Sequence, residues 1–192
     1  KMNAFIATLS MSIILIGSCV TISKGSTLGP LPEVFRFLGR GNVGPIPASI
    51  ITMVVVYLIF IVIFKFTPYG RKLYSVGGNP NAAQASGVNV KWIVFTAYLL
   101  SGLISALGGL VLAGRMGAAV SHMTRNNLLY AFAAAVIGGV SPFGGQGKMI
   151  SIFGGVILLV SINKLLIIAD VDPFLITAVS GIIIFVAMLI LT

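Results

Sequence analysis

Long stretches without charged residues are the feature that most constrains how this chain can fold. They occur at 3–22, 46–64, 92–114 and 174–192, and a fifth, 149–169, carries a single charge, Lys164. About 20 apolar residues in a helix span the ~30 Å hydrocarbon core of a bilayer, where the backbone must satisfy its own hydrogen bonds. Only 8% of the 192 residues are charged, against about 25% in soluble domains. The sequence therefore predicts an all-α, polytopic transmembrane helical bundle.

The first apolar stretch does not read as a signal peptide. It lacks a basic start, a short apolar centre and a small-residue cleavage site, and the chain begins at Lys1. We expect residues 1–192 to form a single transmembrane domain that is incomplete at its N-terminus.

Basic residues predict the orientation of the bundle. The net charge is +9, but the basic residues are concentrated in segments between the apolar stretches, where they set topology, so nucleic acid is not expected as a partner. Segment 65–91 has four basic residues and no acidic one, whereas segment 23–48 has three basic residues and one acidic one. The first is therefore predicted to be cytoplasmic, with Tyr69 and Trp92 at headgroup depth. The second is predicted to be an ordered outer loop with a helical turn around "PEVFRFL".

Residues 128–140, "LLYAFAAAVIGGV", supply only 13 apolar residues before "SPFGGQG", about 20 Å of helix. Either this half-helix re-enters from outside, or it crosses with the help of non-helical backbone shielded by protein or water. We favour the crossing, which gives six spans, one of them broken, and places "ADVDP" outside. Freed backbone groups in this region are predicted to line a translocation path, the alternative being a tight glycine turn. The path candidates are Gly138, Gly139, Ser141, Gly144, Gly145 and Asn163. Lys164 is predicted to be a snorkelling anchor or a path residue.

Small residues recur every four positions in two of the apolar stretches. Such rows let helix backbones approach closely in lipid, and we expect either tight packing or helices that slide past one another. The rows are Ser101, Ser105, Gly109 and Ala113; Gly102, Ala106 and Gly114; and Ala131, Ala135 and Gly139.

The stretch 79–87, "NPNAAQASG", has the marks of a short complete helix. Asn79 suits the N-cap, Pro80 the first helical position and Gly87 a left-handed stop. So short a helix is marginal in water, so something must hold it. Gly77 and Gly78 are predicted to allow a sharp turn, and Ala82, Ala83 and Ala85 to offer a low face to a partner's groove. The alternative is a connector lying on lipid headgroups.

Three quoted segments resemble a known family. "YGRKLYSVGGNPNAAQASGVNV", "YLLSGLISALGGLVLAGRMGAA" and "AAAVIGGVSPFGGQGK" are similar to the permease subunit of bacterial ABC monosaccharide importers of the ribose, xylose and galactose type. "FIATL" and "LPEVFRFLGRG" extend the resemblance over essentially the whole chain. The resemblance implies a C-terminal part of such a permease. It also implies that helix 79–87 is the cytoplasmic coupling helix that contacts an ATPase, through Gly77, Gly78, Asn79, Ala82, Ala83, Ser86 and Gly87.

The resemblance has departures. Family members usually carry a glutamate and an aspartate where this chain has Leu128 and Tyr130, and an Asn-Asn-Gly where it has Asn163 followed by Lys164. These differences put the usual substrate contacts in doubt.

The expected function is that of the membrane-spanning subunit of an ATP-driven importer, moving a monosaccharide across the bacterial inner membrane by alternating access. Its expected partners are a cytoplasmic ABC ATPase, an extracytoplasmic sugar-binding protein, a second permease chain and lipid. No cofactor is expected in this chain, because it has no GxxxxGK[ST] phosphate loop; ATP and Mg²⁺ would bind the ATPase. The three acids, His122 and the single cysteine are scattered, so neither an enzyme nor a metal site is expected. The alternatives are a secondary transporter or channel without an ATPase, or a structural membrane subunit.

Overall fold

The computed structural model describes residues 4–120, 127–142, 144–172, 175, 176, 178, 179, 181 and 182. The chain divides into two compact units, the first formed by residues 1–56 and 101–125 and the second by 57–100 and 126–192. His122 and most of the predicted span 174–192 lie outside the described residues.

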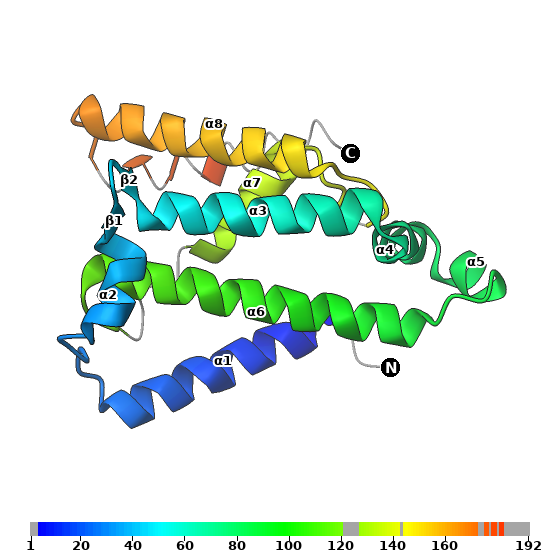
Figure 1. The fold of residues 1–192 in the computed structure, drawn as a ribbon, viewed down its shortest axis with the longest axis horizontal. Helices are drawn as coiled ribbons and strands as arrows, with labels where there is room; N and C mark the ends of the chain where they lie inside the picture. Colours follow the sequence, from blue (N-terminus) through cyan, green and yellow to red (C-terminus); the bar gives the residue numbers. More distant parts are fainter. Residues whose placement is uncertain are drawn as a thin grey trace. The chain divides into compact units, whose positions relative to one another are not determined.

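Helices make up 76% of the described chain (Figure 1). The elements are α1 (Ala4–Ser23), α2 (Glu33–Arg40), β1 (Asn42–Val43), β2 (Ile46–Pro47), α3 (Ala48–Phe66), α4 (Pro68–Gly78), α5 (Pro80–Ala85), α6 (Val90–Met116), α7 (Asn127–Ile137) and α8 (Met149–Ile168). Four of them, α1, α3, α6 and α8, are long and apolar enough to cross a membrane. The all-α polytopic prediction is confirmed.

In the first unit, α2 packs across the end of α6. A side chain on Gly39 or Gly114 would collide with the backbone of the other helix, so both positions allow only glycine at this spacing. Arg40 Nε donates a 2.6 Å hydrogen bond to the carbonyl of Arg115. A cation at a helix C-terminus also interacts favourably with the helix dipole. The helical turn predicted around "PEVFRFL" is confirmed as α2.

Only part of the small-residue rows of α6 packs against another described element. Gly114 is covered by α2, but a Cβ on Gly102, Gly108 or Gly109 would meet no other described atom within 4 Å. Tight packing within the described chain is therefore confirmed at one end of α6 alone.

In the second unit, α4 follows α3 after a single residue. Pro68 lacks the N–H that would continue α3, and Thr67 takes the extended conformation usual before proline. Helix α4 is seen nearly end-on beside the end of α3 in Figure 1, so it runs across the direction of the span. The sequence had indicated a helix only at 79–87 in this segment, so α4 is an element that it missed.

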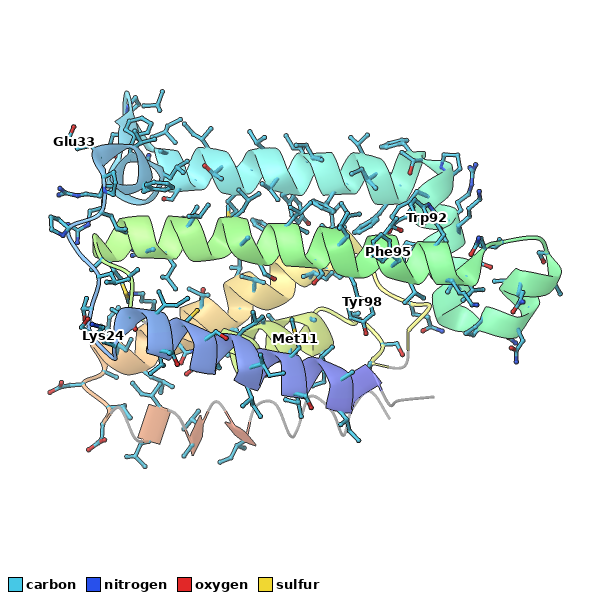
Figure 2. The ribbon with its side chains drawn as sticks, turned by 90° about the horizontal axis from the view of Figure 1, so that it is seen from below. Met11, Lys24, Glu33, Trp92, Phe95 and Tyr98 are labelled. Carbon is cyan, nitrogen blue, oxygen red and sulfur yellow. The ribbon has the colours of Figure 1, made fainter. Side chains whose placement is uncertain are left out.

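Aromatic residues lie near the junction of α4 and α6. Trp92 is 61% exposed at the start of α6 and stacks on Phe95 with ring centroids 5.7 Å apart (Figure 2). Tyr69 is half-buried, and its hydroxyl accepts a 3.1 Å hydrogen bond from Thr96. Trp92 is thus exposed as an interfacial residue should be, whereas Tyr69 has a packing role.

Helices α7 and α8 form an antiparallel hairpin. Ala133 and Leu159 are 0% and 3% exposed between them. A Cβ on Gly138 would lie 2.7 Å from the Ile152 Cα, and one on Gly155 would lie 2.7 Å from the Gly138 nitrogen. The predicted row of α7 is shifted: Ala133, Ala134 and Gly138 are buried, and Ala131 and Gly139 are exposed.

The Gly155 contact gives a stability prediction. Gly155→Ala should lower stability by about 1–3 kcal/mol, as overpacking does, because its methyl would meet the α7 backbone. The measurement is the thermal unfolding midpoint of the purified full-length protein in detergent. Gly154→Ala is the matched control, since no other described atom lies within 4 Å of its Cβ. Equal midpoints for the two variants would contradict the packing.

Candidate functional site

Helix α5 has the capping that its sequence predicted. The Asn79 side-chain oxygen accepts hydrogen bonds of 3.1 Å from the amides of Asn81 and Ala82, and Pro80 is the first helical residue. At the other end Gly87 has φ +82°. The Val88 amide bonds to the Ala83 carbonyl and the Gly87 amide to the Gln84 carbonyl, each at 3.0 Å. This pair of bonds is the Schellman motif, so both predicted ends are confirmed.

The chain itself holds α5 in place. Ala83 is 1% exposed and packs with Val76 of α4 and Ile93 of α6, which are both 5% exposed. The prediction that Ala83 faces a partner is therefore wrong: its methyl is the anchor. Ala82, Ala85 and Ser86 are exposed, so the face available to another protein consists of these residues and their polar neighbours.

Gly77 and Gly78 do not form the predicted turn. Both lie inside α4 and neither has a positive φ. Instead they lie against Gly144 and Gly145: a Cβ on Gly77 would lie 2.6 Å from the Gly145 nitrogen, and one on Gly145 would lie 2.6 Å from the Gly78 Cα. Two glycine pairs, separated by more than sixty residues in the sequence, form one backbone contact.

The loop after α7 is compact. The Ser141 amide bonds to the Gln146 carbonyl at 3.2 Å, and the Gly144 amide bonds to the Ser141 carbonyl at 3.1 Å. Tyr74 of α4 donates a 2.9 Å hydrogen bond to the Gly147 carbonyl. This geometry supports the alternative of a tight glycine turn for the described residues 141, 142 and 144–147, with Gly144 and Gly145 against α4. It also supports the crossing model, because the loop reaches α4, next to α5.

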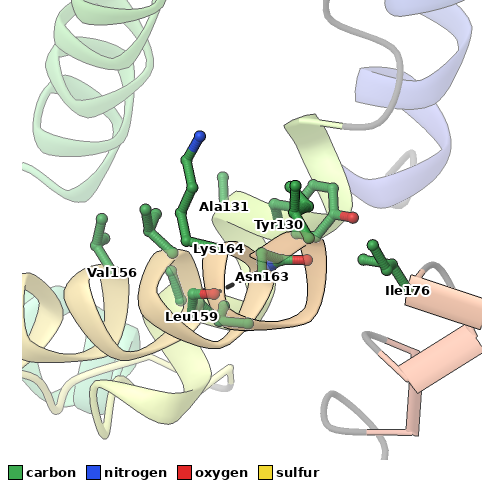
Figure 3. Close-up of a pocket in the computed structure, with 10 residues that line it drawn as sticks. Tyr130, Ala131, Val156, Leu159, Asn163, Lys164 and Ile176 are labelled. Atoms are coloured by element: carbon green, nitrogen blue, oxygen red, sulfur yellow. Dashed lines mark hydrogen bonds between the residues drawn. The ribbon is translucent and has the colours of Figure 1, made fainter. Parts of the chain in front are cut away.

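A groove of about 740 Å³ runs along the other half of the α7–α8 hairpin (Figure 3). Of the predicted path residues Asn163 lines it, and its amide nitrogen donates to the Leu159 carbonyl at 3.1 Å. Gly138, Gly139, Ser141, Gly144 and Gly145 are not among its lining residues. Their path role stays a prediction, and Gly138 has a packing role against α8.

The groove lining is mostly apolar. Its polar side chains are Tyr130, Asn163 and Lys164. Figure 3 shows the Lys164 side chain and the Tyr130 hydroxyl pointing in different directions, so they do not converge on one point. Tyr130 stands where the resembled family carries an aspartate. Because Tyr130 lines the groove, this chain has a tyrosine in the groove wall at that position.

The family model for the branched-chain amino acid transport system / permease component matches residues 1–192. The chain belongs to this permease family. Its helices and its family make it a multi-pass protein of the inner membrane.

Three of the relatives have names that refer to the import or transport of a sugar. The Bacillus subtilis ribose import permease is 36% identical over 191 residues, covering 98% of this chain and 59% of the relative. The Escherichia coli L-arabinose transport system permease is 34% identical over 189 residues, covering 98% and 58%. The Haemophilus influenzae galactose/methyl galactoside import permease is 35% identical over 194 residues, covering 97% and 58%. The chain thus spans less than two thirds of these relatives. No solved structure matches it significantly.

The Asn79 cap gives a prediction for this permease. Asn79→Ala should destabilise α5 by about 1 kcal/mol, the usual effect of losing a cap, because two amides lose their acceptor. Hydrogen exchange at the amides of Ala83 and Ser86 should then be about fivefold faster. Asn79→Asp keeps an acceptor and should exchange at the wild-type rate. Equal rates in all three proteins would show that the cap does not hold α5.

Proposed function

We propose that this chain is part of the membrane-spanning subunit of an ATP-driven importer that moves a monosaccharide by alternating access. The printed names of its relatives, which refer to ribose, arabinose and galactose import or transport, support the substrate class. The proposed partners are a cytoplasmic ABC ATPase, which binds ATP and Mg²⁺, an extracytoplasmic sugar-binding protein and a second permease chain.

The anchored helix α5 is the observation that carries the proposal. A six-residue helix is marginal by itself, yet this one is capped at both ends and fixed by Ala83 between α4 and α6. Its other face exposes Ala82 and Ala85. A small, rigid protrusion with a low apolar face fits a groove on another protein, the helix-in-groove mode of recognition.

Charge supports the side of the membrane on which α5 acts. The segment 65–91 has four basic residues and no acidic one, which favours the cytoplasm. An ATPase that closes on ATP would meet α5 there and move it.

A charge on the exposed face tests the ATPase contact. Ala82→Glu should abolish co-purification of the ATPase and lower ATP-dependent sugar uptake at least tenfold, because a carboxylate would be buried without a partner at the contact. The protein for this test is the full-length permease, reconstituted with its ATPase and binding protein. Binding is read by pull-down and uptake with radiolabelled ribose, arabinose and galactose.

Ala169→Glu is the matched control, an exposed alanine at the C-cap of α8. It should keep the ATPase bound. Sugar uptake by the wild-type complex without ATP would instead support a secondary transporter or channel, and an Ala82→Glu protein that keeps both ATPase and uptake would refute the proposed contact.

A further inference from the structure

We propose that residues 144–147, in the loop between α7 and α8, form a second coupling contact, through which α4 passes a movement of α5 on to the α7–α8 hairpin. Gly77, Gly144 and Gly145 form this contact and Tyr74 fixes its position. The inference rests on the proposed ATPase contact at α5 and names the residues that carry the movement onward.

The first step runs from α5 to α4. The Asn79 amide donates a 3.0 Å hydrogen bond to the Ser75 carbonyl at the end of α4. The same residue is the N-cap of α5. Ala83 and Val76 are buried against each other. No flexible linker separates the two helices, so α5 cannot be displaced far without α4.

The second step runs from α4 to the loop. A Cβ on Gly77 would lie 2.6 Å from the Gly145 nitrogen, and one on Gly144 would lie 2.8 Å from the Gly77 carbonyl oxygen. The two backbones therefore touch without side chains between them. The Tyr74 hydroxyl bonds to the Gly147 carbonyl at 2.9 Å, one turn away on α4, and this second point of attachment prevents the loop from rotating about the first.

The third step runs from the loop to the hairpin. The bonds from Ser141 to Gln146 and from Gly144 to Ser141 close the loop on itself. On its N-terminal side the loop follows Gly138, which packs on Ile152 of α8. On its C-terminal side it leads to Met149, whose carbonyl accepts a 2.5 Å hydrogen bond from the Tyr57 hydroxyl. The loop has little slack, so a displacement at its glycines moves the ends of α7 and α8.

Packed elements transmit displacement because close-packed protein has low compressibility. The hairpin carries the groove with Asn163. A push on α5 would thus reach the groove wall through three contacts within one compact unit.

Gly77→Ala tests this relay, because its methyl would force α4 away from Gly145. The full-length permease is reconstituted with its ATPase and binding protein, and sugar uptake and ATP hydrolysis are measured together. Gly77→Ala should keep the ATPase bound and ATP hydrolysis active, while the amount of sugar moved per ATP falls at least tenfold. An unchanged ratio would overturn the proposal.

Two alanine variants calibrate this result. Gly78→Ala should have a smaller effect than Gly77→Ala, because its Cβ would lie 4.0 Å from the Gly145 Cα, an ordinary contact. Gly154→Ala, in open space on α8, should couple as the wild type does. Equal losses in all three variants would mean that any added methyl disturbs the protein, and the proposal would fail.

Tyr74→Phe decides the matter if Gly77→Ala does not accumulate in the membrane, since it removes only the hydroxyl that bonds to Gly147. It should lower the ratio of sugar to ATP severalfold, and an unchanged ratio would again overturn the proposal. The Ala82→Glu variant separates the two proposals. If Ala82→Glu releases the ATPase while Gly77→Ala stays fully coupled, only the relay is wrong. If Ala82→Glu keeps the ATPase bound, the proposed contact at α5 is wrong.

Discussion

Backbone-to-backbone contact at glycines is the interaction on which the described structure most depends. Helices in lipid gain little from burying apolar side chains, because lipid tails are equally apolar, so close approach of backbones has to supply the attraction. This chain makes that approach where α2 meets α6 at Gly39 and Gly114, where α7 meets α8 at Gly138 and Gly155, and where α4 meets the loop at Gly77 and Gly145. At each contact the glycines let two backbones approach without a side chain between them.

Hydropathy and local capping explain what the sequence could predict. Spans follow from hydropathy alone, so α1, α3, α6 and α8 were predicted within a few residues of their observed bounds. Helix α5 was predictable because its caps are local: Asn79, Pro80 and Gly87 act on backbone groups only a few residues away. Neither inference needs any knowledge of what packs against the helix.

The partners of small residues could not be predicted in this way. Small residues spaced four apart indicate a row, but they do not show which row another helix covers. The row of Ala131 and Gly139 was expected to pack, and the neighbouring row, with Ala134 and Gly138, packs instead. A six-residue helix has too few positions to define its buried face, and Ala83 was placed on the wrong one. Helix α4 was missed because "PYGRKLYSVGG" has three glycines and a mixed polar pattern, and tertiary contacts override such weak propensity.

The choice of alanine on α5 follows from the geometry of its anchor. Ala83 fills the space between Val76 and Ile93 with a single methyl, so the helix axis can lie close to α4 and α6. A larger residue there would hold α5 further from α4 and α6, on a longer arm, where the connection 86–89 to α6 would bend more easily. In the proposed relay, a short helix held close moves with α4, and the contact of Gly77 with Gly144 and Gly145 passes this movement to the hairpin. Small residues at Ala83, Gly77 and Gly145 thus serve the proposed relay together, because they leave no long side chains between α5, α4 and the loop.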